Sequence, residues 1–96
     1  MTKMEAIQQW LEEHEETALT ADGFDDAVIG IVGGHVGRPY RVVYDYEKCV
    51  QVLMSRDEMS EEDAFDHMEF NVVDAYAGPE TPEFLASAEA ILEQAS

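Results

Sequence analysis

The chain has 96 residues, of which 22 are Asp or Glu and only five are Lys or Arg, so its formal net charge is −17. This length suits one domain with one hydrophobic core, and a hydrophobic content of 46% argues against intrinsic disorder. The carboxylates must therefore lie on the surface, which excludes a bare phosphate backbone or an anionic membrane as the partner, because Lys and Arg clusters bind those.

The first predicted helix covers residues 3–19, and Thr2 followed by Glu5 fits a capping box at its start. Its apolar positions recur at helical spacing: Met4, Ile7, Trp10, Leu11 and Ala18, with His14 as a further candidate on the same stripe. Four acids, Glu12, Glu13, Glu15 and Glu16, fall late in this helix. The C-terminal end of a helix carries partial negative charge, so acids kept there hint at a role outside folding.

A two-stranded antiparallel hairpin is predicted next. Residues 27–32 read Ala-Val-Ile-Gly-Ile-Val, a short β-branched run that indicates a buried strand. Residues 33–39 contain three glycines and form the loop, and residues 40–45 predict the second strand, with Tyr40, Val42 and Tyr44 on one face. Two strands alone are marginal, so helices must cover one face, or a third strand must come from elsewhere or from a second copy.

Two further helices are predicted, over residues 46–56 with Asp45 as N-cap and from Ser60 to a stop at Gly78-Pro79. For the last residues two interpretations stay open. In the first, Thr81 and Pro82 begin a helix that runs to about Gln94. In the second, residues 82–85 are extended and the helix starts afterwards. The predicted fold class is α+β, a single domain over residues 1–96 with an antiparallel β-hairpin packed against three or four helices.

Several segments taken in order resemble a known family. They are Phe24–Ile31 (FDDAVIGI), Val43–Cys49 (VYDYEKC), Met59–Ala64 (MSEEDA), Phe70–Gly78 (FNVVDAYAG) and Thr81-Pro82. The set is similar to small bacteriophage and prophage proteins without an assigned activity, over about residues 24–82. The resemblance implies no catalytic residue. It implies a mobile-element origin, the cytoplasm of a bacterial host, and a host-takeover or anti-defence role.

No motif for catalysis or for a resident metal stands out. Asp63, Asp66 and His67 share one side of a predicted helix, and we favour a solvated face over a metal site there. The single cysteine, Cys49, is expected to be a core thiol, and Asn71 a buried hydrogen-bonding residue. No cofactor is therefore predicted, and the absence of a secretory pattern or an apolar run of roughly 18–20 residues favours the cytoplasm.

The charge is uneven along the chain. Residues 27–56 carry a net +2, whereas both flanking segments are acidic. We therefore predict a protein-interaction module whose carboxylates imitate spaced phosphates and occupy a basic, nucleic-acid-binding surface of a host or phage protein. The residues predicted to bind this partner are Glu12, Glu13, Glu15, Glu16, Glu61, Glu62, Asp63 and Asp66.

Two alternatives stay open. The first is a dimerising or assembly protein whose acidity serves only solvation, with hairpin edges pairing between copies. The second is a small-molecule-binding enzyme whose pocket is formed by the hairpin loop together with Tyr44 and Asp45.

Overall fold

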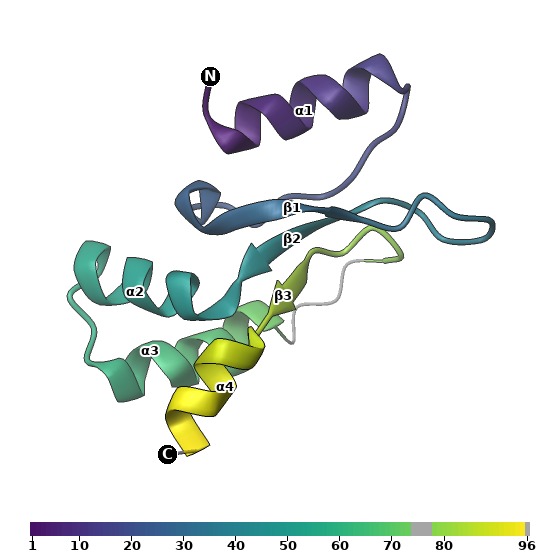
Figure 1. The fold of residues 1–96 in the computed structure, drawn as a ribbon. Coiled ribbons are helices and arrows are strands. Elements are labelled where there is room, and N and C mark those ends of the chain that lie inside the picture. Colours follow the sequence, from purple (N-terminus) through teal and green to yellow (C-terminus); the bar gives the residue numbers. More distant parts are fainter. Residues whose placement is uncertain (74–77, 96) are drawn as a thin grey trace.

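The computed structural model describes residues 1–73 and 78–95, and it shows a small α+β domain (Figure 1). Its elements follow in the order α1 (Lys3–Glu13), η1 (Asp25–Ala27), β1 (Val28–Val32), β2 (Arg41–Asp45), α2 (Tyr46–Arg56), α3 (Glu61–His67), η2 (Met68–Val73), β3 (Glu83–Leu85) and α4 (Ala88–Ala95). Figure 1 shows α1 beside β1, whereas α2, α3 and α4 gather beyond β2 and β3. The predicted fold class is confirmed, and no helix of the described segments is long and apolar enough to cross a membrane.

Strands β1 and β2 form the predicted antiparallel hairpin. Val28 pairs with Tyr44 and Val32 with Arg41, and a β-bulge lies between Val28 and Gly30. The loop needs glycine at residue 33, where φ is +98° and an added Cβ would lie 2.2 Å from the carbonyl oxygen of Pro39. Figure 1 shows this loop projecting away from the rest of the domain.

The third strand, β3, pairs with β2 in parallel, so that Val43 lies opposite Glu83 and Asp45 opposite Leu85. Arg41 fastens this pairing, because its Nε donates to the carbonyl oxygen of Thr81 at 2.7 Å and its guanidinium forms an ion pair with Glu83. The helix predicted to begin at Thr81 is therefore wrong, and the extended alternative is confirmed. The last helix, α4, begins at Ala88, where the hydroxyl of Ser87 accepts from the backbone N–H of Ala90 at 3.1 Å.

Helix α1 has the predicted capping box but ends at Glu13, six residues before the predicted end. The reason is a Schellman motif. The N–H of Glu16 donates to the carbonyl of Leu11 at 2.8 Å, and the N–H of Glu15 donates to that of Glu12 at 3.0 Å. Glu15 takes the left-handed conformation, with φ +56°, at the position that glycine usually occupies. Without a glycine, the sequence gives little sign of this stop.

The core lies between one face of the sheet and the helices. Its fully buried large side chains are Tyr44, Leu53, Met68, Val42 and Cys49. Helix α2 has the predicted bounds, and the Asp45 carboxylate caps it by accepting from the N–H of Lys48 at 3.2 Å.

Two predicted burials are wrong. Asn71 is exposed, and residues 27–32 are buried on one face only, with Ile29 and Val32 each about half exposed. The helix predicted to run from Ser60 to Gly78 is α3 as far as His67 and continues as η2 to Val73, and residues 74–77 lie outside the described residues.

Candidate functional site

All eight predicted partner-binding acids are exposed, and they fall into two groups. The α1 acidic group consists of Glu12, Glu13, Glu15 and Glu16, and the α3 acidic group consists of Glu61, Glu62, Asp63 and Asp66. Figure 1 shows the C-terminal end of α1 at the upper right and the start of α3 at the lower left, at opposite ends of the domain. The structure therefore brings together the members of each group but not the two groups.

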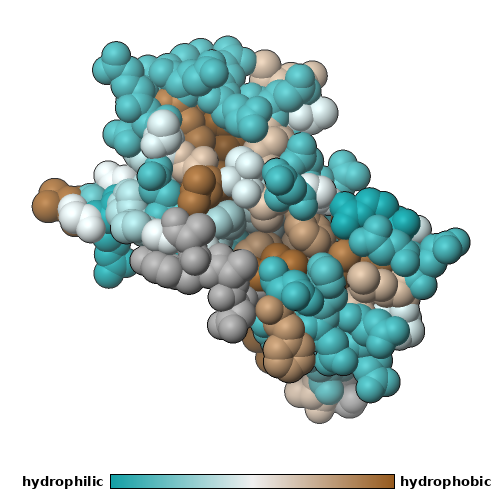
Figure 2. Space-filling view, turned by 180° about the vertical axis from the view of Figure 1, so that it is seen from behind, coloured by the Kyte–Doolittle hydropathy of each residue, from teal (hydrophilic) through white to brown (hydrophobic). Residues whose placement is uncertain are grey.

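Neither group is neutralised by a base. In residues 1–73 and 78–95 the ion pairs are Arg41–Glu83 and Arg56–Asp57, and both lie outside the two groups. Figure 2 shows the hydropathy of one face of the molecule. Hydrophilic residues cover the top, where α1 lies, and the lower right, and hydrophobic residues are exposed between these two regions.

The α3 acidic group has a structural explanation. Glu61, Glu62 and Asp63 occupy the first turn of α3, where the positive end of the helix dipole stabilises carboxylates. The Ser60 hydroxyl caps the same turn by accepting from the N–H of Asp63 at 3.2 Å. These acids therefore contribute to the stability of the helix whether or not a partner exists.

The α1 acidic group has no such explanation. Glu12 and Glu13 lie in the last turn of α1, which contains no basic residue, and Glu15 and Glu16 follow at once. Each carboxylate faces the negative end of the helix dipole, and Glu15 adds the strain of a left-handed backbone. Among the described residues, Gln9 supports this group through its side chain, because its Nε2 donates to Glu13 Oε1 at 3.1 Å.

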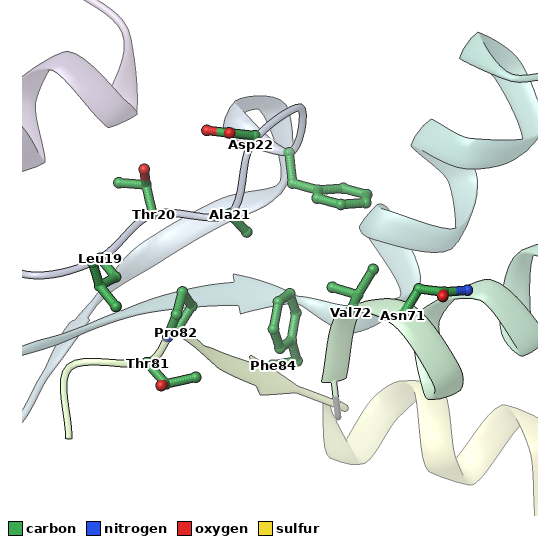
Figure 3. A pocket seen from close by; sticks show the side chains of 10 residues that line it. Leu19, Thr20, Ala21, Asp22, Asn71, Val72, Thr81, Pro82 and Phe84 are labelled. Carbon is green, nitrogen blue, oxygen red and sulfur yellow. The ribbon is translucent and has the colours of Figure 1, made fainter. Parts of the chain in front are cut away.

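A cavity of about 380 Å³ lies between residues 19–24, the end of η2 and the start of β3. Figure 3 shows Leu19, Pro82, Phe84 and Val72 around it, while the carboxylate of Asp22 and the amide of Asn71 point away. The cavity is therefore mainly apolar, and among the described residues that line it no acid and base converge.

The proposed enzyme pocket at the hairpin loop does not gather its predicted residues. A groove of about 790 Å³ does lie beside the loop, but Tyr44 and Asp45 do not line it. Tyr44 is buried, with its hydroxyl accepting from the N–H of Ala21 at 2.8 Å, and burial raises its pKa. Asp45 serves as the N-cap of α2. Both residues therefore have structural roles.

Cys49 lies in the core as predicted, with no exposed surface. Burial, helped by the negative charge of Asp45, raises the pKa of its thiol to about 12. The thiol is protonated near neutral pH and is a poor nucleophile. Within the described segments, no three His, Cys, Asp or Glu side chains lie close enough together to hold a metal ion, and this includes Asp63, Asp66 and His67.

Comparison with known proteins adds no family to this description. No protein-family model, no curated protein and no solved structure matches the chain. The functional argument therefore depends on the physical properties of the surface.

Proposed function

We propose that this chain is an acidic protein-interaction module that binds the basic, nucleic-acid-binding surface of a bacterial or phage protein. The α1 acidic group makes the primary contact. The observation that carries the proposal is the crowding of four exposed carboxylates, none of them in an ion pair within the described residues, at the C-terminal end of α1, where they oppose the helix dipole. A sequence under selection for stability alone would favour Lys, Arg or Gly at these positions.

The charge density of the α1 acidic group supports imitation of a nucleic acid. Five consecutive residues, Glu12–Glu16, contain four carboxylates. Glu12 and Glu13 lie in the last turn of α1, and Glu15 and Glu16 follow within three residues of its end, so the four charges are crowded into a short segment. Duplex DNA likewise carries closely spaced charges, roughly one phosphate per 1.7 Å of its axis. A surface that binds phosphates therefore also meets closely spaced negative charges here.

The α3 acidic group has a secondary role in this proposal. Because the two groups lie at opposite ends of the domain (Figure 1), one flat partner surface reaches only one of them. The α3 group instead adds to the net charge of −17, which draws a basic partner from a distance and makes association fast and sensitive to salt. On the basis of the resemblance to phage proteins, the proposal also places the protein in the cytoplasm of a bacterial host and gives it a host-takeover or anti-defence role.

Two matched variants test this assignment. The first replaces Glu12, Glu13, Glu15 and Glu16 by Gln, and the second replaces Glu61, Glu62, Asp63 and Asp66 by their amides. Each variant removes four charges from a net −17, so long-range attraction falls equally in both. Immobilised wild type and both variants are used to capture proteins from bacterial lysate at low and high salt, with identification by mass spectrometry. Each captured protein is then titrated directly and in competition with duplex DNA.

Four exposed charge pairs at about 0.2–1 kcal/mol each amount to about 0.8–4 kcal/mol. We therefore expect the first variant to weaken binding by about 4-fold to several hundred-fold. The second variant should weaken binding only a few-fold. The first variant should raise the free energy of unfolding, because it removes acids from a helix C-terminus. The second variant should lower the free energy of unfolding, because it removes acids from a helix N-terminus. The proposal would be refuted if the wild type and the first variant bound the captured protein equally well. It would also be refuted if the chain failed to displace duplex DNA from the captured proteins.

A further inference from the structure

The sheet has one face turned to the core and one open face. On the open face, the strand register forms three rows of neighbouring residues. The middle row contains Gly30, Val43 and Glu83. The row on one side of it contains Val32 and Arg41, and the row on the other side contains Asp45 and Leu85. Val32 and Leu85 are each 49% exposed, and Val43 is partly exposed. A sheet face that stays in water normally carries polar side chains, so apolar residues at these positions indicate a face that a partner covers.

Most of the chain's few cations surround this face. Arg38 and Arg41 line the groove of about 790 Å³ that crosses it beside the hairpin loop, together with His35. Lys3 and Lys48 line a second hollow at the opposite end, where Ile29 and Asp45 lie. Arg41 already forms an ion pair with Glu83, and Asp26 and Asp45 share the second hollow with the lysines. Among the described residues, Arg38, Lys3 and Lys48 are therefore the cations beside this face that form no ion pair. This arrangement favours an occupant that is both apolar and acidic.

Helix α4 has those properties. Its apolar stripe consists of Ala88, Ile91, Leu92 and Ala95, and Ile91 and Leu92 are 56% and 70% exposed. Of its eight residues, all of which the structure describes, only Ala90 is buried. Glu89 and Glu93 are its charged residues, and it contains no base.

The α4 helix of the same copy is held elsewhere. Gln94 lines a hollow together with residues of α2 and α3, including Val50 and Phe65. Figure 1 shows α4 on the side of the domain where α3 lies, so in this copy it does not cover the open face. An α4 helix on the open face must therefore come from a second copy.

We propose that the open sheet face binds the α4 helix of a second copy of this chain, and that two copies exchange these contacts in a two-fold symmetric dimer. The dimensions agree, since three strands about 4.8 Å apart present a surface roughly one helix wide. Each α4 places Ile91 and Leu92 against the apolar centre of the face and its acids near the surrounding cations. At physiological salt the acidic groups at the ends of α1 and α3 are screened beyond about 8 Å, so they do not prevent this contact.

Single substitutions test the two sides of the interface separately. Gly30→Glu places a carboxylate on the open face, and an added Cβ at this position meets no atom within 4 Å, so the monomer keeps its fold. Leu92→Glu places a carboxylate in the apolar stripe of α4. The control is Val36→Glu, which adds the same charge at a fully exposed apolar residue of the hairpin loop. Molar mass is measured by light scattering and sedimentation equilibrium over a range of concentrations at physiological salt.

We expect the wild type and the control to be dimers, and each interface variant to raise the dissociation constant at least about tenfold. A mixture of the two interface variants should partly recover the dimer, because one intact α4 and one intact face remain between them. A wild type that stays monomeric at every concentration overturns the proposal. So does a dimer that Gly30→Glu leaves unchanged, which would indicate another interface, and so does a mixture that shows no recovery.

Discussion

Replacing Glu15 by glycine should stabilise the domain, although it adds the most flexible residue. Glu15 has φ +56° at the end of α1, and this left-handed conformation costs an L-residue about 1–2 kcal/mol. Glycine loses about 0.5–1 kcal/mol more entropy on folding, whereas removal of a carboxylate from the helix C-terminus contributes about 0.3–1 kcal/mol. The sum predicts a net gain of about 1 kcal/mol in the free energy of unfolding.

The measurement is urea unfolding followed by circular dichroism, with thermal unfolding as a second probe. A gain of this size corresponds to about 4–8 °C in a domain of fewer than 100 residues. Glu15→Gln isolates the contribution of the charge, because it keeps the left-handed strain. Glu12→Gly is the matched control within the regular helix, where glycine should cost about 1 kcal/mol. If Glu15→Gly were no more stable than Glu15→Gln, the argument from backbone strain would be refuted.

Three further predictions concern the core and its connections. Tyr44→Phe should lower the free energy of unfolding by about 1–2 kcal/mol, because the N–H of Ala21 loses its acceptor; equal urea midpoints would contradict this. Asp45→Ala should cost about 1 kcal/mol while Asp45→Asn costs much less, because only the asparagine can still accept from the N–H of Lys48. Burial raises the pKa of the Cys49 thiol in the folded chain, so folding favours the neutral thiol. This contribution to the free energy of unfolding is complete below the ordinary thiol pKa of about 8.5, and it is lost as the pH rises towards about 12. Urea unfolding above pH 8.5 should therefore show a steeper loss of stability in the wild type than in Cys49→Ala, and parallel losses would rule out this contribution.

Local signals in the sequence predicted much of the fold. The capping residues Thr2, Asp45 and Ser60 each begin a helix by accepting from a backbone N–H three residues later. Because this contact is local, each cap was recognisable from the sequence without tertiary information. The hairpin followed in the same way from two β-branched runs joined by a glycine-rich loop. These features depend on residues close together in the chain.

The features that the sequence left open or did not reveal depend on distant or unusual contacts. Residues 82–85 stayed open between a helix and an extended segment because their own pattern is weak, and Arg41 and β2 hold residues 83–85 as a strand. The end of α1 was missed because a glutamate occupies a position typical of glycine. For the candidate site, net charge alone required exposed acids, but their division between two ends of the domain depends on where the sheet places α1 and α3.

The parallel pairing of β2 with β3 has a consequence for how the domain assembles. The partners Val43 and Glu83 are forty positions apart, so α2, α3 and η2 must be brought into a closed loop before the third strand can join. The first two strands meet across a short turn and face no such entropic barrier. We therefore expect the hairpin and its neighbouring helices to form early, and the docking of residues 83–85 to set the folding rate.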